Sequence, residues 1–328
     1  MEEKYMKTLL KTASAIAATL ALIGSAAWAE SHASEDMSWT QSKYGPEDEI
    51  GAANLLSPEL AKKAAGLVTT GKVYSLGIVL DSETPAFAPR SMSIAVLQPG
   101  QVNNTGLGDT KTTYNDDIFM GWLGIGSQID GLGHIGVDHT YYNGFEGSDF
   151  VQGNGLTKLG IEKVPPIVSR GVMLDMAKFY GMDMLPEGKA YTREDIVAAA
   201  EQQGVTFEEG DVVLFHSGWL NLLDEGGDRA RFGSVEPGLG KTGAEFLIEQ
   251  GVIAVGADTW GLEAVPFEPG VGVFEIHQML LAHNGIFILE SMDTREMAKD
   301  DVHEFMFVLG QAKVRGAVQM IINPVAIR

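Results

Sequence analysis

Short apolar runs that alternate with capped helical segments constrain the fold of this chain most strongly. The runs lie at 73–80, 171–175, 211–215, 252–256 and 286–289. Each is rich in valine, isoleucine and leucine and has the length of a buried strand.

Helix boundaries between these runs are marked by capping residues. Ser57 with Pro58 predicts a helix start before 58–65, and Thr192 predicts another that ends at Gly204. Two further helices are expected at 242–250, before Gly251, and at 277–283. The alternation predicts an α/β fold in a single domain, with a mixed sheet or barrel-like β core flanked by helices.

Residues 1–29 have the pattern of a secretory signal peptide. Three lysines precede the apolar stretch 13–23, which is too short to span a bilayer, and Ala27-Trp28-Ala29 is a small-x-small cleavage site. We therefore expect cleavage after Ala29 and export to a bacterial periplasm. A disordered lead-in at 30–37 and a folded domain at 38–328 would follow. An uncleaved N-terminal anchor is the alternative.

Composition excludes several kinds of site and partner. The chain has no cysteine, so it cannot contain disulfides, thiolate metal sites or cysteine nucleophiles. Its formal net charge of −21 disfavours nucleic acid and anionic membranes, although it also simply favours solubility. We expect a small-molecule substrate and neither a nucleic-acid nor a membrane partner.

The glycine-rich stretch 126–134 carries side chains that suit a divalent metal ion. Gln128, Asp130 and His134 lie close together in it, and His277 and Glu290 follow far downstream. Oxygen and imidazole donors bind Zn²⁺ or Mn²⁺, and glycines let nearby side chains converge.

Each of these residues also has an ordinary structural interpretation. Asp130 before Gly131 could cap a turn, His134 could be a hydrogen-bonded core histidine, and His277 could pack beside Leu280. Glu290 ends an apolar strand, where an unpartnered charge is unfavourable, which favours a ligand role. His216, at the end of another strand, could equally face the cavity or the core.

The arrangement of motifs resembles the cyclase family of metal-dependent hydrolases, which includes kynurenine formamidase and isatin hydrolase. The family signature is His-x-Gly-Thr-His-x-Asp-x-x-x-His, and the similarity runs from near residue 40 to the C-terminus. The aligned signature residues are Gly124, Gly126, Ser127, Gln128, Asp130 and His134. Similar blocks occur at 44–54, 210–219, 255–259 and 277–290. The resemblance implies a swivelling β/β/α fold and a homodimer or homotetramer.

This chain departs from the signature at its first two histidines, which are replaced by Gly124 and Gln128. The similarity is to a longer-chain branch of the family, with glutamine in the second position. In metal-binding relatives those two histidines help to hold a first ion, so the resemblance implies one retained metal site here. The ligands it implies are Asp130, His134 and Glu290, with Gln128 or His277 as possible additions.

The predicted activity is hydrolysis of an amide or cyclic amide with the help of one Zn²⁺ or Mn²⁺ ion. His134, Glu290 and His277 are the candidate catalytic residues, and either of the first two could accept the proton of water. The aromatic wall of the pocket is expected from Trp122, Tyr141, Tyr142, Phe145 and Trp260. Two alternatives remain: a lactone-opening enzyme of the same fold, and a periplasmic binding protein without catalysis.

Overall fold

The computed structural model describes residues 37–97 and 106–328. The chain divides into a segment that ends at Trp39 and a compact unit from Thr40 to Arg328, which contains the whole of the central sheet. The predicted signal peptide and all of the predicted lead-in except Met37 lie outside the described residues. Among the helices of the described part, none is both long and apolar enough to cross a bilayer.

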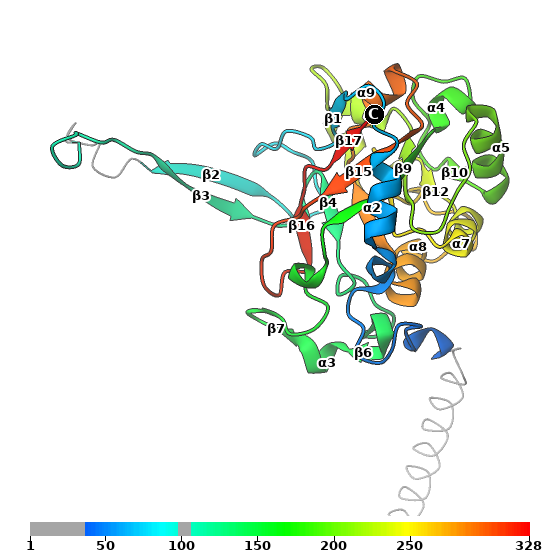
Figure 1. Ribbon diagram of the computed structural model, residues 1–328, viewed down its shortest axis with the longest axis horizontal. Coiled ribbons are helices and arrows are strands. Elements are labelled where there is room, and N and C mark those ends of the chain that lie inside the picture. Colours follow the sequence, from blue (N-terminus) through cyan, green and yellow to red (C-terminus); the bar gives the residue numbers. More distant parts are fainter. Residues whose placement is uncertain (1–36, 98–105) are drawn as a thin grey trace, which may run out of the picture. The chain divides into compact units, whose positions relative to one another are not determined.

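A mixed nine-stranded sheet forms the centre of the unit (Figure 1). In spatial order its strands are β1 (Val73–Ser75), β17 (Val325–Ile327), β15 (Glu304–Leu309), β9 (Ile167–Asp175), β11 (Val212–His216), β13 (Ala254–Ala257), β14 (Phe287–Glu290), β4 (Gln128–Asp130) and β16 (Gln319–Ile321). Strands β9, β11, β13 and β14 are parallel to one another, and the outer strands pair antiparallel. The four parallel strands are buried almost throughout, as expected for strands covered on both faces.

Helices flank this sheet, which confirms the predicted α/β fold. The longer ones are α2 (Pro58–Ala65), α5 (Arg193–Gln203) and α7 (Lys241–Gln250), and the shorter ones are α3 (Gly147–Phe150), α4 (Met176–Phe179), α6 (Arg229–Phe232), α8 (Glu275–His277) and α9 (Arg295–Lys299). Helix α2 packs on β9 and β15, and α5 packs against β9 and α7. Thr192 and Asp195 form a reciprocal capping box at the start of α5, and Gly204 ends it at a φ of 70°.

Two predicted elements differ from the structure. The predicted strand 73–80 ends at Ser75, because the backbone N–H of Ile78 donates to the hydroxyl of Ser127 at 2.9 Å instead of to a neighbouring strand. The predicted helix 277–283 begins earlier, at Glu275, and continues after His277 as a wider π-type turn over Gln278–His283. Such turns often lie at functional sites.

A two-stranded hairpin projects from the unit (Figure 1). Its strands are β2 (Met92–Leu97) and β3 (Asp116–Gly121), and we call this hairpin the arm. Smaller ribbons pair β5 (Thr140–Tyr141) with β6 (Phe145–Glu146), β7 (Val151–Gln152) with β8 (Gly155–Leu156), and β10 (Ala190–Tyr191) with β12 (Gly238–Leu239).

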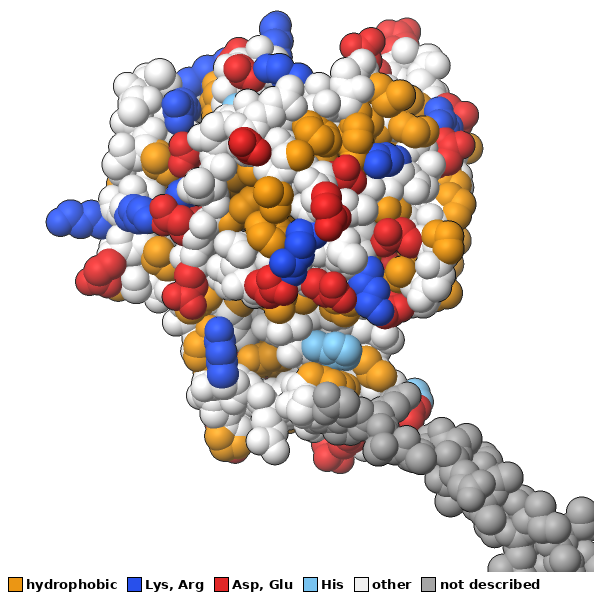
Figure 2. Space-filling view, turned by 90° about the vertical axis from the view of Figure 1, so that its right-hand side faces the viewer, with side chains coloured by type: hydrophobic (Ala, Val, Ile, Leu, Met, Phe, Trp, Pro, Cys, Tyr) orange, Lys and Arg blue, Asp and Glu red, His pale blue; other side chains and the backbone are white. Residues whose placement is uncertain are grey.

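The surface charge is mixed, although the total is strongly negative. On the face drawn in Figure 2, acidic and basic side chains are interspersed. Several acidic and basic side chains of the described residues pair, such as Lys178 with Asp301 at 2.6 Å and Arg193 with Glu249 at 2.5 Å. Exposed pairs of this kind contribute little to stability, so the fold depends mainly on its apolar core.

Candidate metal centre

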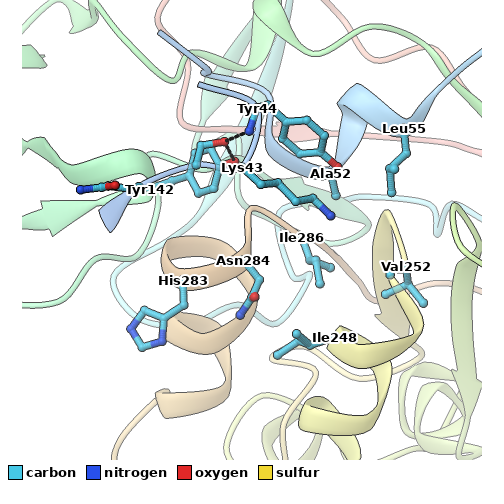
Figure 3. Close-up of a pocket in the computed structure, with 13 residues that line it drawn as sticks. Lys43, Tyr44, Ala52, Leu55, Tyr142, Ile248, Val252, His283, Asn284 and Ile286 are labelled. Carbon is cyan, nitrogen blue, oxygen red and sulfur yellow. Dashed lines mark hydrogen bonds between the residues drawn. The ribbon is translucent and has the colours of Figure 1, made fainter. Parts of the chain in front are cut away.

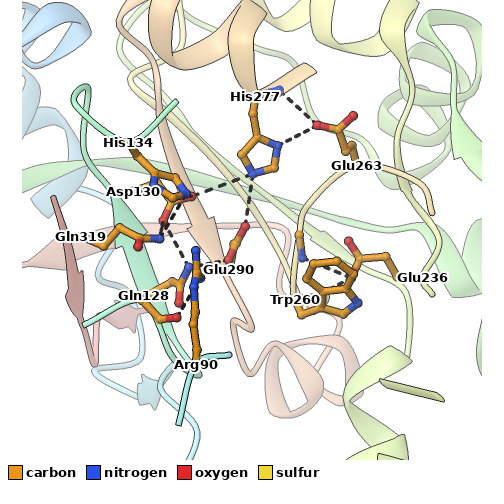
Figure 4. A network of polar contacts seen from close by, with 12 residues as sticks. Arg90, Gln128, Asp130, His134, Glu236, Trp260, Glu263, His277, Glu290 and Gln319 are labelled. Atoms are coloured by element: carbon orange, nitrogen blue, oxygen red, sulfur yellow. Dashed lines mark hydrogen bonds and ion pairs between the residues drawn. The ribbon is translucent and has the colours of Figure 1, made fainter. Parts of the chain in front are cut away.

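The register of three neighbouring strands brings four polar side chains to one face of the sheet. Glu290 on β14 lies directly opposite Gln128 on β4, and Gln319 on β16 lies opposite Asp130. Gln128 and Asp130 are two residues apart on one strand, so both point to the same face, while Ile129 between them is buried on the other. The pairing therefore makes carboxylates and carboxamides alternate, with Gln128 between Glu290 and Asp130 and Gln319 on the other side of Asp130 (Figure 4).

The carboxamides hydrogen-bond the carboxylates. The Gln128 side-chain nitrogen donates to Glu290 Oε2 at 2.6 Å and to Asp130 Oδ1 at 3.2 Å. The Gln319 nitrogen donates to Asp130 Oδ1 at 2.6 Å. These bonds occupy one oxygen of each carboxylate. The other Asp130 oxygen, Oδ2, is buried and has no hydrogen-bond partner.

His277 approaches the free side of the carboxylates from α8. Its Nε2 lies 3.3 Å from Glu290 Oε1 and 3.9 Å from Asp130 Oδ2. Glu263 fixes the ring from behind, because its Oε1 accepts from His277 Nδ1 at 2.7 Å and from the backbone N–H at 3.1 Å. Because Glu263 accepts the proton of Nδ1, Nε2 is the nitrogen whose lone pair would be available to a metal ion.

These three donors fit a single divalent ion. One ligand atom each from Asp130, His277 and Glu290 lies within 4.8 Å of the others, and all three residues are buried. Ligand atoms about 2 Å from one Zn²⁺ are roughly 3–4 Å apart, close to the two shorter distances in this cluster. A buried carboxylate oxygen without a partner is unfavourable unless something binds it, and a cation would satisfy it.

Burial and neighbouring groups shift the pKa values of Glu290 and His277. Burial raises the pKa of Glu290 to about 7, and the neighbouring charge of Asp130 acts in the same direction. Burial lowers the pKa of His277, but hydrogen bonds to Glu263 and Glu290 outweigh this and raise it to about 10. A proton therefore bridges His277 and Glu290 when no cation does, and a metal ion would have to displace it.

His134 lies next to the three donors. The turn after β4 carries it, and its Nε2 is 3.9 Å from Asp130 Oδ2 and 3.4 Å from the Gln319 nitrogen. Burial lowers the pKa of His134, so its imidazole is neutral at pH 7. The structure thus brings all five predicted site residues together, with His277 among the three converging donors and His134 beside them. Their roles as ligands or bases stay predictions.

Sequence reasoning missed Gln319, which occupies the space left by the absent signature histidine. A Cβ atom added to Gly124 would collide with the Gln319 side chain. Gln128, predicted as a possible ligand, directs its nitrogen at both carboxylates, and this geometry favours a donor role over ligation. The signal for Gln319 was a lone amide within the apolar run 317–322.

A cavity of about 330 Å³ opens in front of the donors. His134, His277 and Glu290 line it, together with Arg90 and Ile135. Phe87, Trp260 and Phe274 form an aromatic wall, with Phe87 and Trp260 stacked at a ring-centroid distance of 5.8 Å. The buried carboxylate of Glu236 anchors this wall by accepting from the backbone N–H of Trp260 at 2.7 Å.

The predicted aromatic wall was right only at Trp260. Tyr142 lines a different cavity of about 190 Å³ (Figure 3), and its hydroxyl donates to Asp48 at 2.6 Å. This bond anchors the N-terminal block 44–54 and holds the Tyr142 ring away from the donors. Among the described residues, Trp122, Tyr141 and Phe145 do not line the cavity at the donors, and Phe87 and Phe274 were missed.

Comparisons with known proteins agree with this architecture. A family model described as "Putative cyclase" matches residues 74–264, which is more than half of the chain. The crystal structure of a novel cyclase is 32% identical, covers 87% of this chain and 96% of its own, and superimposes with a TM-score of 0.79. A search of curated proteins gave no match.

Two isatin hydrolases share the fold at lower identity. Isatin hydrolase A from Labrenzia aggregata, bound to benzyl benzoate, is 16% identical over 82% of this chain and 98% of its own, with a TM-score of 0.58. Isatin hydrolase A from Ralstonia solanacearum is 18% identical over 83% of this chain and 97% of its own, with a TM-score of 0.57. From the matching family model and the 32% identical cyclase we conclude that this chain belongs to the cyclase family.

Proposed function

We propose that this protein is a hydrolase that uses one divalent ion, Zn²⁺ or Mn²⁺, to cleave an amide or cyclic amide. The observation that carries the proposal is the buried, unpartnered Oδ2 of Asp130, which faces His277 Nε2 and Glu290 Oε1. Asp130, His277 and Glu290 would hold the cation, which would act as a Lewis acid on a carbonyl and on water near neutral pH.

The side chains around the donors divide the remaining tasks. The aromatic wall packs against a flat ring, which places the carbonyl of that ring near Glu290 and His277. The water oxygen bonds to the carbonyl carbon while the neutral imidazole of His134 accepts a proton from that water. His134 then returns the proton to the leaving nitrogen as the carbon–nitrogen bond breaks. Glu263 accepts the Nδ1 proton of His277 and so would leave Nε2 to bind the ion once its own proton is displaced.

Assays with ring substrates test this function. Metal-loaded protein should open isatin, chelation should abolish the activity, and Zn²⁺ or Mn²⁺ should restore it. Activity that survives complete chelation would contradict the proposal. Faster opening of the lactone dihydrocoumarin than of any amide would select the lactone alternative. Absence of turnover on both rings, together with tight binding of either, would select the binding-protein alternative.

The homo-oligomer belongs to this proposal, and the arm is the surface that supports it. Both arm strands expose apolar side chains, including Ile94, Val96, Ile118 and Met120. A two-stranded ribbon is marginally stable alone, and exposed apolar patches mark interaction surfaces. Light scattering should give at least twice the monomer mass for the parent chain and a smaller mass for Ile118→Asp. Val197→Asp, on the exposed face of α5, is the matched control and should leave the mass unchanged.

Export to the periplasm is proposed from the signal-peptide pattern of residues 1–29. Mass spectrometry of the protein from its native host should find Glu30 as the first residue. A soluble protein that retains Met1 would contradict export by cleavage.

A further inference from the structure

Arg90 is the cationic side chain in the wall of the cavity at the donors. It lies on the loop that leads into the arm, three residues after Phe87, and reaches up beside Gln128 and Glu290 (Figure 4). The candidate metal donors, the aromatic wall and the guanidinium group of Arg90 therefore line one cavity. A flat ligand that contacts both the donors and the aromatic wall shares this cavity with the guanidinium group.

The backbone at the base of the arm holds Arg90 in this position. Its Nη1 donates to the carbonyl oxygen of Gly124 at 2.8 Å. On the next residue, the backbone carbonyl of Ser91 accepts from the backbone N–H of Trp122 at 3.2 Å. These bonds tie the two ends of the arm together. A side chain fixed in this way loses less conformational entropy when it binds a ligand.

Among the described residues, most of the hydrogen-bonding capacity of Arg90 remains for a ligand. A guanidinium carries five N–H donors in a planar fork, and the bond to Gly124 uses one of them. Among the described residues, Arg90 forms no ion pair within 4.0 Å, even though its side chain is partly buried. This contrasts with Arg170, which is buried and pairs with Glu208 at 2.9 Å.

We propose that Arg90 is a specificity-determining residue that selects aromatic substrates carrying a carboxylate next to the bond that is cleaved. The fork geometry of arginine matches a carboxylate through two parallel hydrogen bonds. The aromatic wall of Phe87, Trp260 and Phe274 accepts the flat ring to which the carboxylate is attached. This inference rests on the proposed function, because the donors at Glu290 and His277 define where the cleaved bond lies.

Binding of two matched probes tests the inference without turnover. Benzoate and benzamide have nearly the same shape and differ in charge. Calorimetry on metal-loaded protein should show that the parent chain prefers benzoate by about tenfold or more, as expected for a charge-assisted pair. Arg90→Gln should reduce the preference to near unity and leave benzamide affinity unchanged, which also shows that the variant is folded. Arg90→Lys, which keeps the charge but not the fork, should be intermediate.

A control separates this role from a general effect of charge. Arg229→Gln removes a partly buried arginine outside the cavity and should keep the full preference for benzoate. A preference that survives in Arg90→Gln would overturn the inference, because the metal ion alone would then explain it. Equal affinity of the parent chain for both probes, or binding of neither at millimolar concentration, would overturn it as well.

The result of the binding test can be separated from the result of the hydrolysis assay. A parent chain that opens isatin while Arg90→Gln keeps its benzoate preference would refute the role of Arg90 and leave the proposed function standing. A parent chain with no hydrolytic activity whose benzoate preference disappears in Arg90→Gln would refute the function and support the anion site.

Discussion

Two clusters of buried polar side chains lie near strand ends of the same sheet, and they differ in how their carboxylates are satisfied. At the end of β13, Asp258 Oδ1 accepts from the Ser217 backbone and hydroxyl at 2.9 and 2.6 Å, and its Oδ2 accepts from Gly218 at 2.8 Å. Asp130 on β4 has one oxygen bonded and the other, Oδ2, without a partner. In the cluster at Asp258 the protein itself supplies partners for both carboxylate oxygens, and we call it the closed cluster. In the cluster at Asp130 one oxygen lacks a protein partner, and we call it the open cluster.

The two aspartates, Asp130 and Asp258, are otherwise alike. Both Asp130 and Asp258 are completely buried and both lie in sequence blocks similar to those of the cyclase family. His216, beside Asp258, directs its Nδ1 to the Thr294 hydroxyl at 2.8 Å and to Asp258 at 3.4 Å, so it completes the closed cluster. Burial and sequence similarity are therefore shared by the two aspartates, and the candidate metal centre differs in the unsatisfied oxygen of Asp130 and in the two further donors that converge with it.

The largest contrast is expected from the same substitution in the two clusters. Asp130→Asn should abolish metal binding and lower activity on the order of 10³-fold, because it removes a ligand charge on which several kcal/mol of Lewis-acid stabilisation depend. The free energy of unfolding of the metal-free protein should hardly fall. Elemental analysis and kinetics on the same sample give both results. Full activity in Asp130→Asn would contradict the metal role.

Asp258→Asn should have the opposite profile. An amide nitrogen would face the Gly218 N–H in place of an acceptor, and an unsatisfied buried donor costs about 1–3 kcal/mol of stability. Urea denaturation should show this loss, while the metal content of the folded protein stays at the parental value. Loss of metal without loss of stability would remove the distinction between the clusters.

Gln319→Leu tests whether the carboxamides support the open cluster. It deprives Asp130 Oδ1 of its 2.6 Å donor, so metal affinity should fall about 10–100-fold, as is usual when a group that orients a ligand is removed. Gln311→Leu is the matched control, because Gln311 is equally buried and donates to Val164 at 2.6 Å away from the cavity. Equal metal affinity in the two variants would show that Gln319 only fills space.

The smallest effect is expected far from both clusters. Thr192→Ala removes the cap of α5 and should lower the free energy of unfolding by about 1 kcal/mol, with metal affinity unchanged. This variant measures how a loss of stability far from the donors affects metal affinity. A change in metal affinity in Thr192→Ala would mean that affinity reports general stability, and the contrast between the clusters would then carry no information.

The features that the sequence predicted well are those encoded over short distances. Helix caps at Ser57 and Thr192, apolar strand runs, and the cluster of Gln128, Asp130 and His134 depend on neighbours along the chain. Local pattern does not show which strands become neighbours. Gln319 lies opposite Asp130 across 189 residues, so its contact with that carboxylate could not be seen in advance.

The ligand cavity was the least predictable part, because loops from distant segments build it. Phe87 and Arg90 come from the loop before the arm, and Phe274 precedes α8 at a left-handed φ of 51°. Such a φ is uncommon for a bulky residue and has no local sequence signal. Glu263 and Glu236 could have been suspected, because each is an acid next to apolar residues and both are buried at the site.

The number of metal ions per chain tests the account most directly. Protein purified without chelators, then dialysed against Zn²⁺ or Mn²⁺, should contain about one tightly bound ion per chain, because only one side of the Asp130 and Glu290 carboxylates is open and carboxamides cover the other. Asp130→Asn should contain none. Two tightly bound ions per chain, or full hydrolytic activity with none, would contradict the account.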